Sequence, residues 1–268
     1  LGAGRPGWHI ECSVMSMKYL GETLDIHTGG IDLTFPHHEN EIAQSEAITG
    51  KPFVRYWLHA EHLMVESQKM SKSLGNFYTL RDLLAQGYQP EVIRYLLASV
   101  PYRKKLNFTF DGLRASQTAL ERLRNYQLRL NTTRFPEGVS EPILEATRKA
   151  KESFEASLDE DLNTAEALGA IFEFIRVTNT AMDSGEFKTG NVEPARQLLA
   201  LFDSIFDVLR PTVPAGALSD TEVDALTAER TAAKKSKNFN RADEIRNLLA
   251  GQGVILEDTK DGVRWKRK

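Results

Sequence analysis

The sequence contains a single cysteine, Cys12, among its 268 residues. One cysteine cannot form an intrachain disulfide framework, and this fits a reducing compartment. The sequence also has no apolar run near the roughly 20 residues that a membrane helix needs, and no signal-peptide pattern. We therefore expect a cytoplasmic protein that does not bind a membrane.

Excess charge of one sign is also absent. The chain has 34 basic and 37 acidic residues, for a formal net charge of -3, so its composition alone does not suggest nucleic-acid binding. Basic residues nevertheless cluster late, from Arg230 to Arg241 and again in the last five residues. The length is sufficient for two domains. Because the chain opens at Leu1 with no initiator methionine and no helix or strand start, we expect a piece of a longer protein.

The residues that carry chemistry are concentrated near the beginning. All six histidines and the cysteine lie between His9 and His62, and chance would scatter them. A short strand is predicted over residues 24–27, followed by Gly29 and Gly30. Glycines after a strand allow a nucleotide to approach the backbone closely. Such a pair is more often a simple turn, so this signal is weak alone.

A possible metal site includes the cysteine. Pro36 suits the first position of a helix, which is predicted from His37 to about Ile48. His37 and Glu41 are four residues apart and therefore share a helix face. With Cys12 they offer the sulfur, nitrogen and oxygen ligands that zinc takes. The alternative is that His37 and His38 are ordinary surface or packing histidines. It is supported by the presence of only three candidate ligands and by the lack of a Cys-x-x-Cys pair.

Two lysines flank small hydroxyl residues in the segment Lys69-Met70-Ser71-Lys72-Ser73. A lysine ammonium is a flexible point charge that can follow a phosphate as it moves. Gly75 lets the backbone turn sharply after this segment, and a helix is predicted from Thr79. The alternative is a solvated basic loop. Strands predicted at residues 57–60 and 62–65 lead into the loop and have the rhythm of a parallel sheet.

The second half of the sequence is predicted to be almost wholly helical. Apolar residues recur at helical spacing from Asp111 onward, and they are far more typical of a bundle core than of a ligand site. Asn163 to Glu166 has the form of a capping box. A loop rich in proline, alanine and glycine, at residues 211–219, precedes a last small unit. It is predicted to contain a helix at 242–249 and a hairpin around Asp261-Gly262.

Taken together, several stretches resemble the cysteinyl-tRNA synthetase family of class I aminoacyl-tRNA synthetases. The stretches are Gly4-Arg5-Pro6-Gly7-Trp8-His9-Ile10-Glu11-Cys12, Asp25-Ile26-His27 with Gly29-Gly30 and Asp32-Leu33, Phe35-Pro36-His37-His38-Glu39-Asn40-Glu41, the KMSKS loop at 69–73, Asp159-Glu160-Asp161-Leu162-Asn163-Thr164, and Leu256-Glu257-Asp258 with Trp265. The family's first sheet half, with its HIGH motif and one zinc-ligating cysteine, has no counterpart in this sequence. We therefore expect the chain alone to be inactive.

The resemblance implies an α/β plus all-α fold. Residues 1–78 would be the second half of a Rossmann-like parallel-sheet catalytic domain, and 79–110 connecting helices. Residues 111–215 would form a helical bundle that binds tRNA, and 216–268 a small α/β anticodon-binding unit. The protein is expected to be a monomer.

The resemblance also implies an activity, namely ATP-dependent activation of L-cysteine and its transfer to the 3′ end of the tRNA for cysteine. Cys12, His37 and Glu41 would be three of four protein ligands of a Zn²⁺ ion that selects the substrate thiol. Trp8 and His27 would lie near the bound cysteine.

Five further residues are implied in binding ATP and its leaving group. Gly29, Gly30 and Asp32 would hold the adenosine of ATP, which binds with Mg²⁺. Lys72, supported by Lys69, would stabilise charge on the departing pyrophosphate.

For the tRNA, the resemblance implies anticodon reading by Asp243, Asp258 and Trp265. Exposed bases are read by stacking on aromatic rings and by hydrogen bonds from side chains. The alternative is that Trp265 packs inward and that the basic end is only solvated.

Two other functions stay open at this point. The ligase of the mycothiol pathway, which joins cysteine to an amino sugar, shares nearly this whole catalytic half. It has no use for a unit that reads an anticodon, so the helical bundle and the basic end argue against it. A non-catalytic tRNA-binding protein is the second alternative. The presence of Cys12, His37, Glu41 and Lys72 counts against it.

Overall fold

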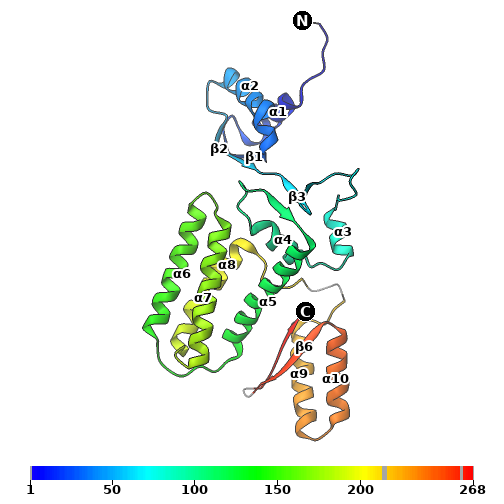
Figure 1. Cartoon of the computed structure of the whole chain (residues 1–268), viewed down its shortest axis with the longest axis vertical. Coiled ribbons are helices and arrows are strands. Elements are labelled where there is room, and N and C mark those ends of the chain that lie inside the picture. The colour runs from blue at the N-terminus through cyan, green and yellow to red at the C-terminus, as the bar shows by residue number, and fades with distance from the viewer. Residues whose placement is uncertain (1, 213–215, 260–261, 268) are drawn as a thin grey trace. The chain divides into compact units, whose positions relative to one another are not determined.

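The computed structural model describes residues 2–212, 216–259 and 262–267, and leaves the side chain of Thr259 aside (Figure 1). The chain forms two compact units. The first contains residues 1–78 and 97–110, and the second contains residues 79–96 and 111–268. Among the described residues, no helix is both long and apolar enough to span a bilayer.

The first unit begins with a parallel strand pair flanked by two helices. Its elements are α1 (Trp8–Leu20), β1 (Leu24–Gly30), a 3-10 turn (Ile31–Leu33), a wide π-type turn (Thr34–His38), α2 (Glu39–Thr49) and β2 (Val54–Ala60). Strands β1 and β2 pair in parallel, with His27 opposite Trp57 and Gly29 opposite His59. A parallel pair requires a crossover connection, which α2 provides (Figure 1). The end of β1 therefore lies at the same edge as the end of β2.

A second sheet in this unit contains β3 (Leu63–Val65), β4 (Gln68–Lys69) and β5 (Leu106–Phe108). Strand β3 pairs antiparallel with β4 and parallel with β5. The sequence did not predict β5, because only its pairing with β3 marks these three residues as a strand.

The helix predicted from His37 begins later, at Glu39. Phe35, which precedes the proline, is extended with φ -136° and ψ 134°, and its peptide bond to Pro36 is cis. A residue before proline is disfavoured in helical conformation. This accounts for the extended Phe35. His37 lies in the π-type turn, which runs directly into the regular helix, because His38 already has a helical backbone (φ -68°, ψ -36°).

The second unit is dominated by helices. Its first part comprises α3 (Leu80–Ala85), α4 (Pro90–Ala98, whose last two residues are assigned to the first unit), α5 (Phe110–Thr132), α6 (Glu141–Asp159), α7 (Thr164–Ser184), a short 3-10 turn (Thr189–Asn191) and α8 (Val192–Phe206). Leu120, Phe154, Ile171 and Phe202 are among the buried side chains that fill the core between the long helices. Asn163 caps α7 by accepting a hydrogen bond from the backbone N–H of Glu166. The reciprocal half of the predicted capping box is absent, because the Asn163 N–H donates to the Ser157 carbonyl.

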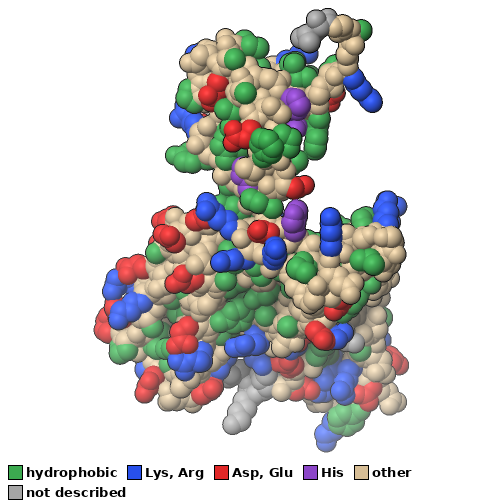
Figure 2. Space-filling model, turned by 45° about the horizontal axis from the view of Figure 1, so that its top comes forward, with side chains coloured by type: hydrophobic (Ala, Val, Ile, Leu, Met, Phe, Trp, Pro, Cys, Tyr) green, Lys and Arg blue, Asp and Glu red, His purple; other side chains and the backbone are tan. Residues whose placement is uncertain are grey.

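The outer faces of α6 and α7 carry both signs of charge. Figure 2 shows basic and acidic side chains interspersed over this part of the surface. Neighbouring residues pair along each helix, as Arg148 does with Glu145 and Glu152, and Arg176 with Glu173. In each pair a basic and an acidic side chain neutralise one another, so these helices present a mixed, solvated surface rather than a positively charged patch.

The last part of the second unit comprises α9 (Asp220–Lys235), α10 (Phe239–Gly251), β6 (Val254–Thr259) and β7 (Gly262–Arg267). Ser219 opens α9 with a capping box. A small core contains Val223, Ile245, Leu249 and Val254. The predicted hairpin is confirmed by the antiparallel pairing of β6 and β7. Residues 213–215 of the predicted loop and Asp261 of the predicted turn lie outside the described residues.

Candidate metal and nucleotide site

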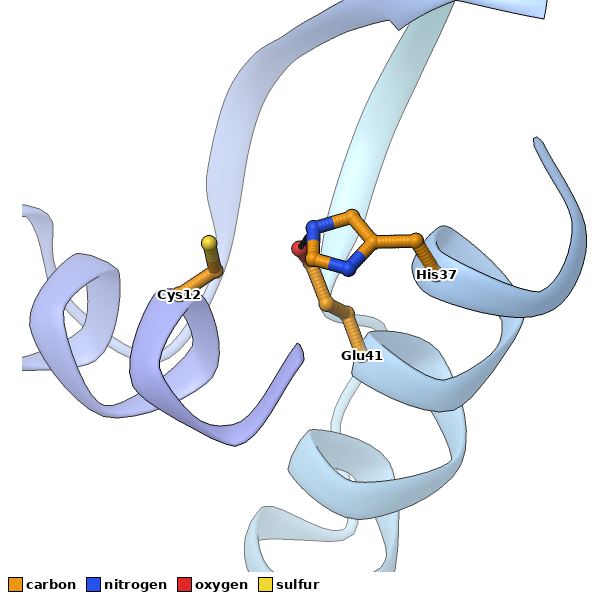
Figure 3. A group of neighbouring side chains, drawn as sticks. All are labelled: Cys12, His37 and Glu41. Atoms are coloured by element: carbon orange, nitrogen blue, oxygen red, sulfur yellow. Dashed lines mark ion pairs between the residues drawn. The ribbon is translucent and has the colours of Figure 1, made fainter. Parts of the chain in front are cut away.

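Three side chains in the first unit converge as a ligand set. Cys12 comes from α1, His37 from the turn before α2, and Glu41 from the first turn of α2 (Figure 3). Their ligand atoms all lie within 4.8 Å of one another. His37 and Glu41 are buried, and Cys12 is half-buried. The structure therefore brings these three predicted residues together.

The residues fit a zinc ion. Glu41 Oε1 is buried and lies 2.7 Å from His37 Nε2, and the two form an ion pair only if the imidazole is protonated. A zinc-ligating histidine is neutral, and with a neutral Nε2 facing it this oxygen has no hydrogen-bond donor among the described residues. A buried carboxylate oxygen without a hydrogen bond costs free energy unless a cation or donor satisfies it. The cysteine supplies the sulfur ligand that zinc favours, together with nitrogen and oxygen.

Burial shapes the protonation of the groups in this site. Burial, followed by the neighbouring Glu41 carboxylate, raises the pKa of the Cys12 thiol. Burial, followed by the nearby His27, lowers the pKa of His38 to about 4. The His38 imidazole is consequently neutral at neutral pH, which avoids a buried cation beside the ligand set.

The two residues predicted to lie near the substrate occupy different places around this set. The ring centre of Trp8 lies 4.2 Å from that of His37, and the Trp8 side chain is 60% exposed. Trp8 therefore lies on the solvent-facing side of the ligand set. His27 lies deeper. Its Nε2 is 2.7 Å from Glu41 Oε2.

The predicted adenosine residues lie at the end of β1, where parallel strands commonly place a nucleotide. A side chain at Gly29 would come within 2.6 Å of the His38 ring, and one at Gly30 within 2.5 Å of Asp32 Oδ1. The buried His38 ring therefore favours glycine at position 29, whereas at position 30 the neighbour is the tip of the exposed Asp32 side chain, which can move. Asp32 is exposed just beyond the strand.

The lysine loop follows β4 and leaves both Lys69 and Lys72 exposed. Lys72 Nζ lies 5.3 Å from the ring centre of Phe77. Asn76, which the sequence reasoning missed, closes the loop: its Oδ1 accepts from the backbone N–H of Ser71 at 2.8 Å, and its Nδ2 donates to the Lys69 carbonyl at 3.1 Å. The asparagine directly after Gly75 was the available signal.

The three predicted anticodon residues lie in the second unit in different surroundings. Asp243 is exposed on α10. Asp258 on β6 accepts from Arg230 at 3.0 and 3.1 Å and from Lys234 at 2.9 Å. Hydrogen bonds from Arg230 and then Lys234 hold the pKa of the Asp258 carboxyl well below its usual range.

Trp265 packs against the small core and donates from Nε1 to Asp224 at 2.7 Å. The exposed aromatic of this unit is Phe239, which the sequence reasoning missed. Its side chain is 61% exposed, and it lies one helical turn before Asp243 on α10. An aromatic residue between Lys237 and Arg241 was the signal in the sequence.

Known protein families match two parts of the chain. Residues 1–118 match the class I (C) tRNA synthetase catalytic domain, and residues 153–210 match the DALR domain. Over 268 residues the chain is 68% identical to the cysteine–tRNA ligase of Solibacter usitatus (strain Ellin6076), covering all of this chain and 58% of that protein. The chain belongs to the cysteine–tRNA ligase family.

A second member of the family, from Koribacter versatilis (strain Ellin345), is 51% identical over 296 residues, covering all of this chain and 60% of that protein. The chain thus spans about three-fifths of the length of these cysteine–tRNA ligases. A solved leucyl-tRNA synthetase complex, the agnB2 LeuRS-tRNA-LeuAMS ternary complex of Agrobacterium radiobacter K84, aligns with a TM-score of 0.54. The alignment covers 69% of this chain and 26% of that one at 20% identity, and it supports the fold alone. The predicted family and fold class are confirmed, while the predicted domain bounds stay predictions.

Proposed function

We propose that the full-length gene product is a cysteine–tRNA ligase. It would activate L-cysteine with ATP to cysteinyl-adenylate and transfer the cysteinyl group to the 3′ end of the tRNA for cysteine. The observation that carries the proposal is the convergence of Cys12, His37 and Glu41 beside an exposed tryptophan. Their donor set suits a metal that distinguishes a thiol from a hydroxyl.

Cys12, His37 and Glu41 would hold Zn²⁺, and Trp8 would bound the space in front of it. When bound, zinc prefers soft sulfur and takes a coordinating thiol as the thiolate. Serine differs from cysteine by one atom, and a shaped apolar pocket discriminates such changes by only about 10- to 200-fold. A metal site therefore provides selection that shape alone would not.

The nucleotide would bind at the end of β1, with Mg²⁺ accompanying its phosphates. Gly29 and Gly30 would admit the adenosine to the backbone, and Asp32 would accept from ribose hydroxyls. The cysteine carboxylate forms a bond to the α-phosphorus while the bond to the bridging oxygen breaks and pyrophosphate leaves. Lys72 and Lys69 would neutralise the charge that develops on that leaving group.

The second unit would bind the tRNA, with its anticodon at the small C-terminal part. Asp243 offers its carboxylate oxygens to exposed base edges. Asp258, predicted for the same role, has both oxygens engaged by Arg230 and Lys234. Phe239, together with the predicted Trp265, offers a ring for stacking. Because Trp265 already packs on the core and Phe239 is open, we assign the larger stacking contribution to Phe239.

The test is ATP–pyrophosphate exchange by the full-length gene product with cysteine or serine as substrate, together with zinc analysis. We expect exchange with cysteine alone. The Cys12→Ser variant should lose zinc and raise the KM for cysteine while sparing the KM for ATP. Full zinc content and unchanged kinetics in Cys12→Ser would remove this residue from the site.

The amino-sugar ligase is not favoured, because the DALR match and the C-terminal unit have no role in a reaction without tRNA. Charging of the tRNA for cysteine by the same preparation, with no product from cysteine and an amino sugar, would separate the two activities. We further propose that the full-length protein is a monomer and is located in the cytoplasm. Sedimentation of the purified protein tests its oligomeric state.

A further inference from the structure

Glu41 has a second partner in addition to His37. Its side chain is fully buried, so contacts with the protein determine the direction of its carboxylate. Oε1 faces His37, and Oε2 lies 2.7 Å from His27 Nε2. An ionised carboxylate only accepts hydrogen bonds, so His27 must carry its proton on Nε2 and donate.

The His27 ring is itself held in place by packing. It stacks on Trp57, directly opposite in the β1–β2 pair, with ring centres 4.8 Å apart and planes inclined by 25°. On another side its ring centre is 4.8 Å from that of His38, whose Nδ1 lies 2.8 Å from His59 Nε2. The absent side chain of Gly29 leaves the space that the His38 ring occupies. The donor thus comes from a rigid group, and a rigid donor can fix the orientation of its acceptor.

We infer that His27 is a positioning residue for the metal: it orients the Glu41 carboxylate so that Oε1 points at the site shared with Cys12 and His37. Hydrogen bonds to ligating carboxylates orient them, and loss of such partners typically costs about 10- to 100-fold in metal affinity. This inference rests on the proposed zinc site. It differs from the role implied by resemblance, in which His27 lies near the substrate cysteine.

Two substitutions separate the hydrogen bond from the ring. His27→Gln keeps a donor at a reach comparable to Nε2 and removes the ring. His27→Phe keeps the stack on Trp57 and His38 and removes the donor. Zinc affinity of the full-length gene product is measured by competition with a chromophoric chelator, without substrates. We expect about 10- to 100-fold weaker zinc binding for His27→Phe, and His27→Gln within about threefold of the wild type.

Three controls make the result decisive. His62→Phe, at an exposed histidine of the same unit, should leave zinc affinity unchanged. His37→Ala should abolish it. If His27→Phe does not fold by circular dichroism, His27→Asn replaces it, since its shorter amide does not reach Glu41. That variant should bind zinc as weakly as expected for His27→Phe.

Each outcome has one meaning. Equal zinc affinity in the wild type and in the donor-free variant would overturn the positioning role, as would strong loss in His27→Gln with retention in His27→Phe. The absorption spectrum of bound Co²⁺ should change in the donor-free variant and persist in His27→Gln. If His37→Ala binds zinc as tightly as the wild type, the proposed metal site itself fails, which is a different result.

Discussion

Removing the Asp258 carboxylate should destabilise the hairpin of the C-terminal part. The Arg230 side chain is 4% exposed and donates to both oxygens of Asp258, while Lys234 donates to one of them. Asp258→Ala leaves the Arg230 guanidinium buried beside a lysine with no counter-charge. Breaking a fully buried pair costs about 3–5 kcal/mol. The Asp258 side chain is 55% exposed, so water screens the pair and we expect about 1–3 kcal/mol.

Amide hydrogen exchange of β6 and β7 measures this loss locally. A loss of 1–3 kcal/mol corresponds to roughly 5- to 150-fold faster exchange where the hairpin opens and recloses rapidly compared with the exchange step. Amides of α6 and α7 in the same sample should not change and serve as the internal reference. Asp243→Ala is the matched variant, because within the described chain this exposed carboxylate has no ion-pair partner. It should leave hairpin exchange unchanged.

The pH dependence of the same pair has a definite sign. The folded-state pKa of Asp258 is depressed, so its contribution is fully present above the unfolded value of about 3.9 and is lost as pH falls through the folded value. The difference between wild type and Asp258→Ala should be constant from neutral pH to about pH 5 and shrink only in stronger acid. Unchanged exchange in Asp258→Ala, with weaker binding of the tRNA for cysteine, would refute the structural role and favour base reading.

Three further changes test the first unit. Lys72→Ala in the full-length gene product should slow adenylate formation by about 10²-fold or more in single-turnover assays, and a rate near wild type would contradict its role. Asn76→Ala removes two hydrogen bonds of about 0.5–1.5 kcal/mol each, so limited proteolysis should cut the lysine loop faster. An unchanged cleavage rate would show that these two hydrogen bonds do not hold the loop in place. Gly29→Ala should cost about 1–3 kcal/mol in urea denaturation by crowding the His38 ring, whereas Gly4→Ala, with open space around it, should not; equal stability would show that the ring can move.

The sequence predicted the parts of the site that depend on short-range spacing or on a continuous motif. His37 and Glu41 are close because they are four residues apart, and they remain on one side even though His37 lies in a turn. Cys12 was proposed as the sulfur donor from its chemistry alone, and the family resemblance then implied the same ligand set. The His27 contact was not predicted, because it depends on how β1 lies against α2, and a pattern of residues does not report the distance between elements.

The C-terminal part shows a related limit. Trp265 and Asp258 have the side chains that base recognition needs, and the same properties suit them to packing and ion pairing within their own unit. Residue type does not distinguish the two uses. Burial and partners do: Asp258 is tied to Arg230, and Trp265 lies on the small core, whereas Phe239 is open. Only the folded unit identifies which aromatic is available to a partner.

Glu41 illustrates how one side chain comes to serve both the metal and the scaffold. Its place in the first turn of α2 directs one oxygen to His37, which precedes the helix, and the other to His27 on β1. The contact with His27 on the strand is needed because the terminal χ3 torsion of a glutamate has a broad distribution of angles. A carboxylate contacted only from its own helix could therefore rotate. A contact from a second element removes that freedom before any ion binds. Metal affinity in this site should therefore depend on the integrity of the β1–β2 pair as well as on the three ligands.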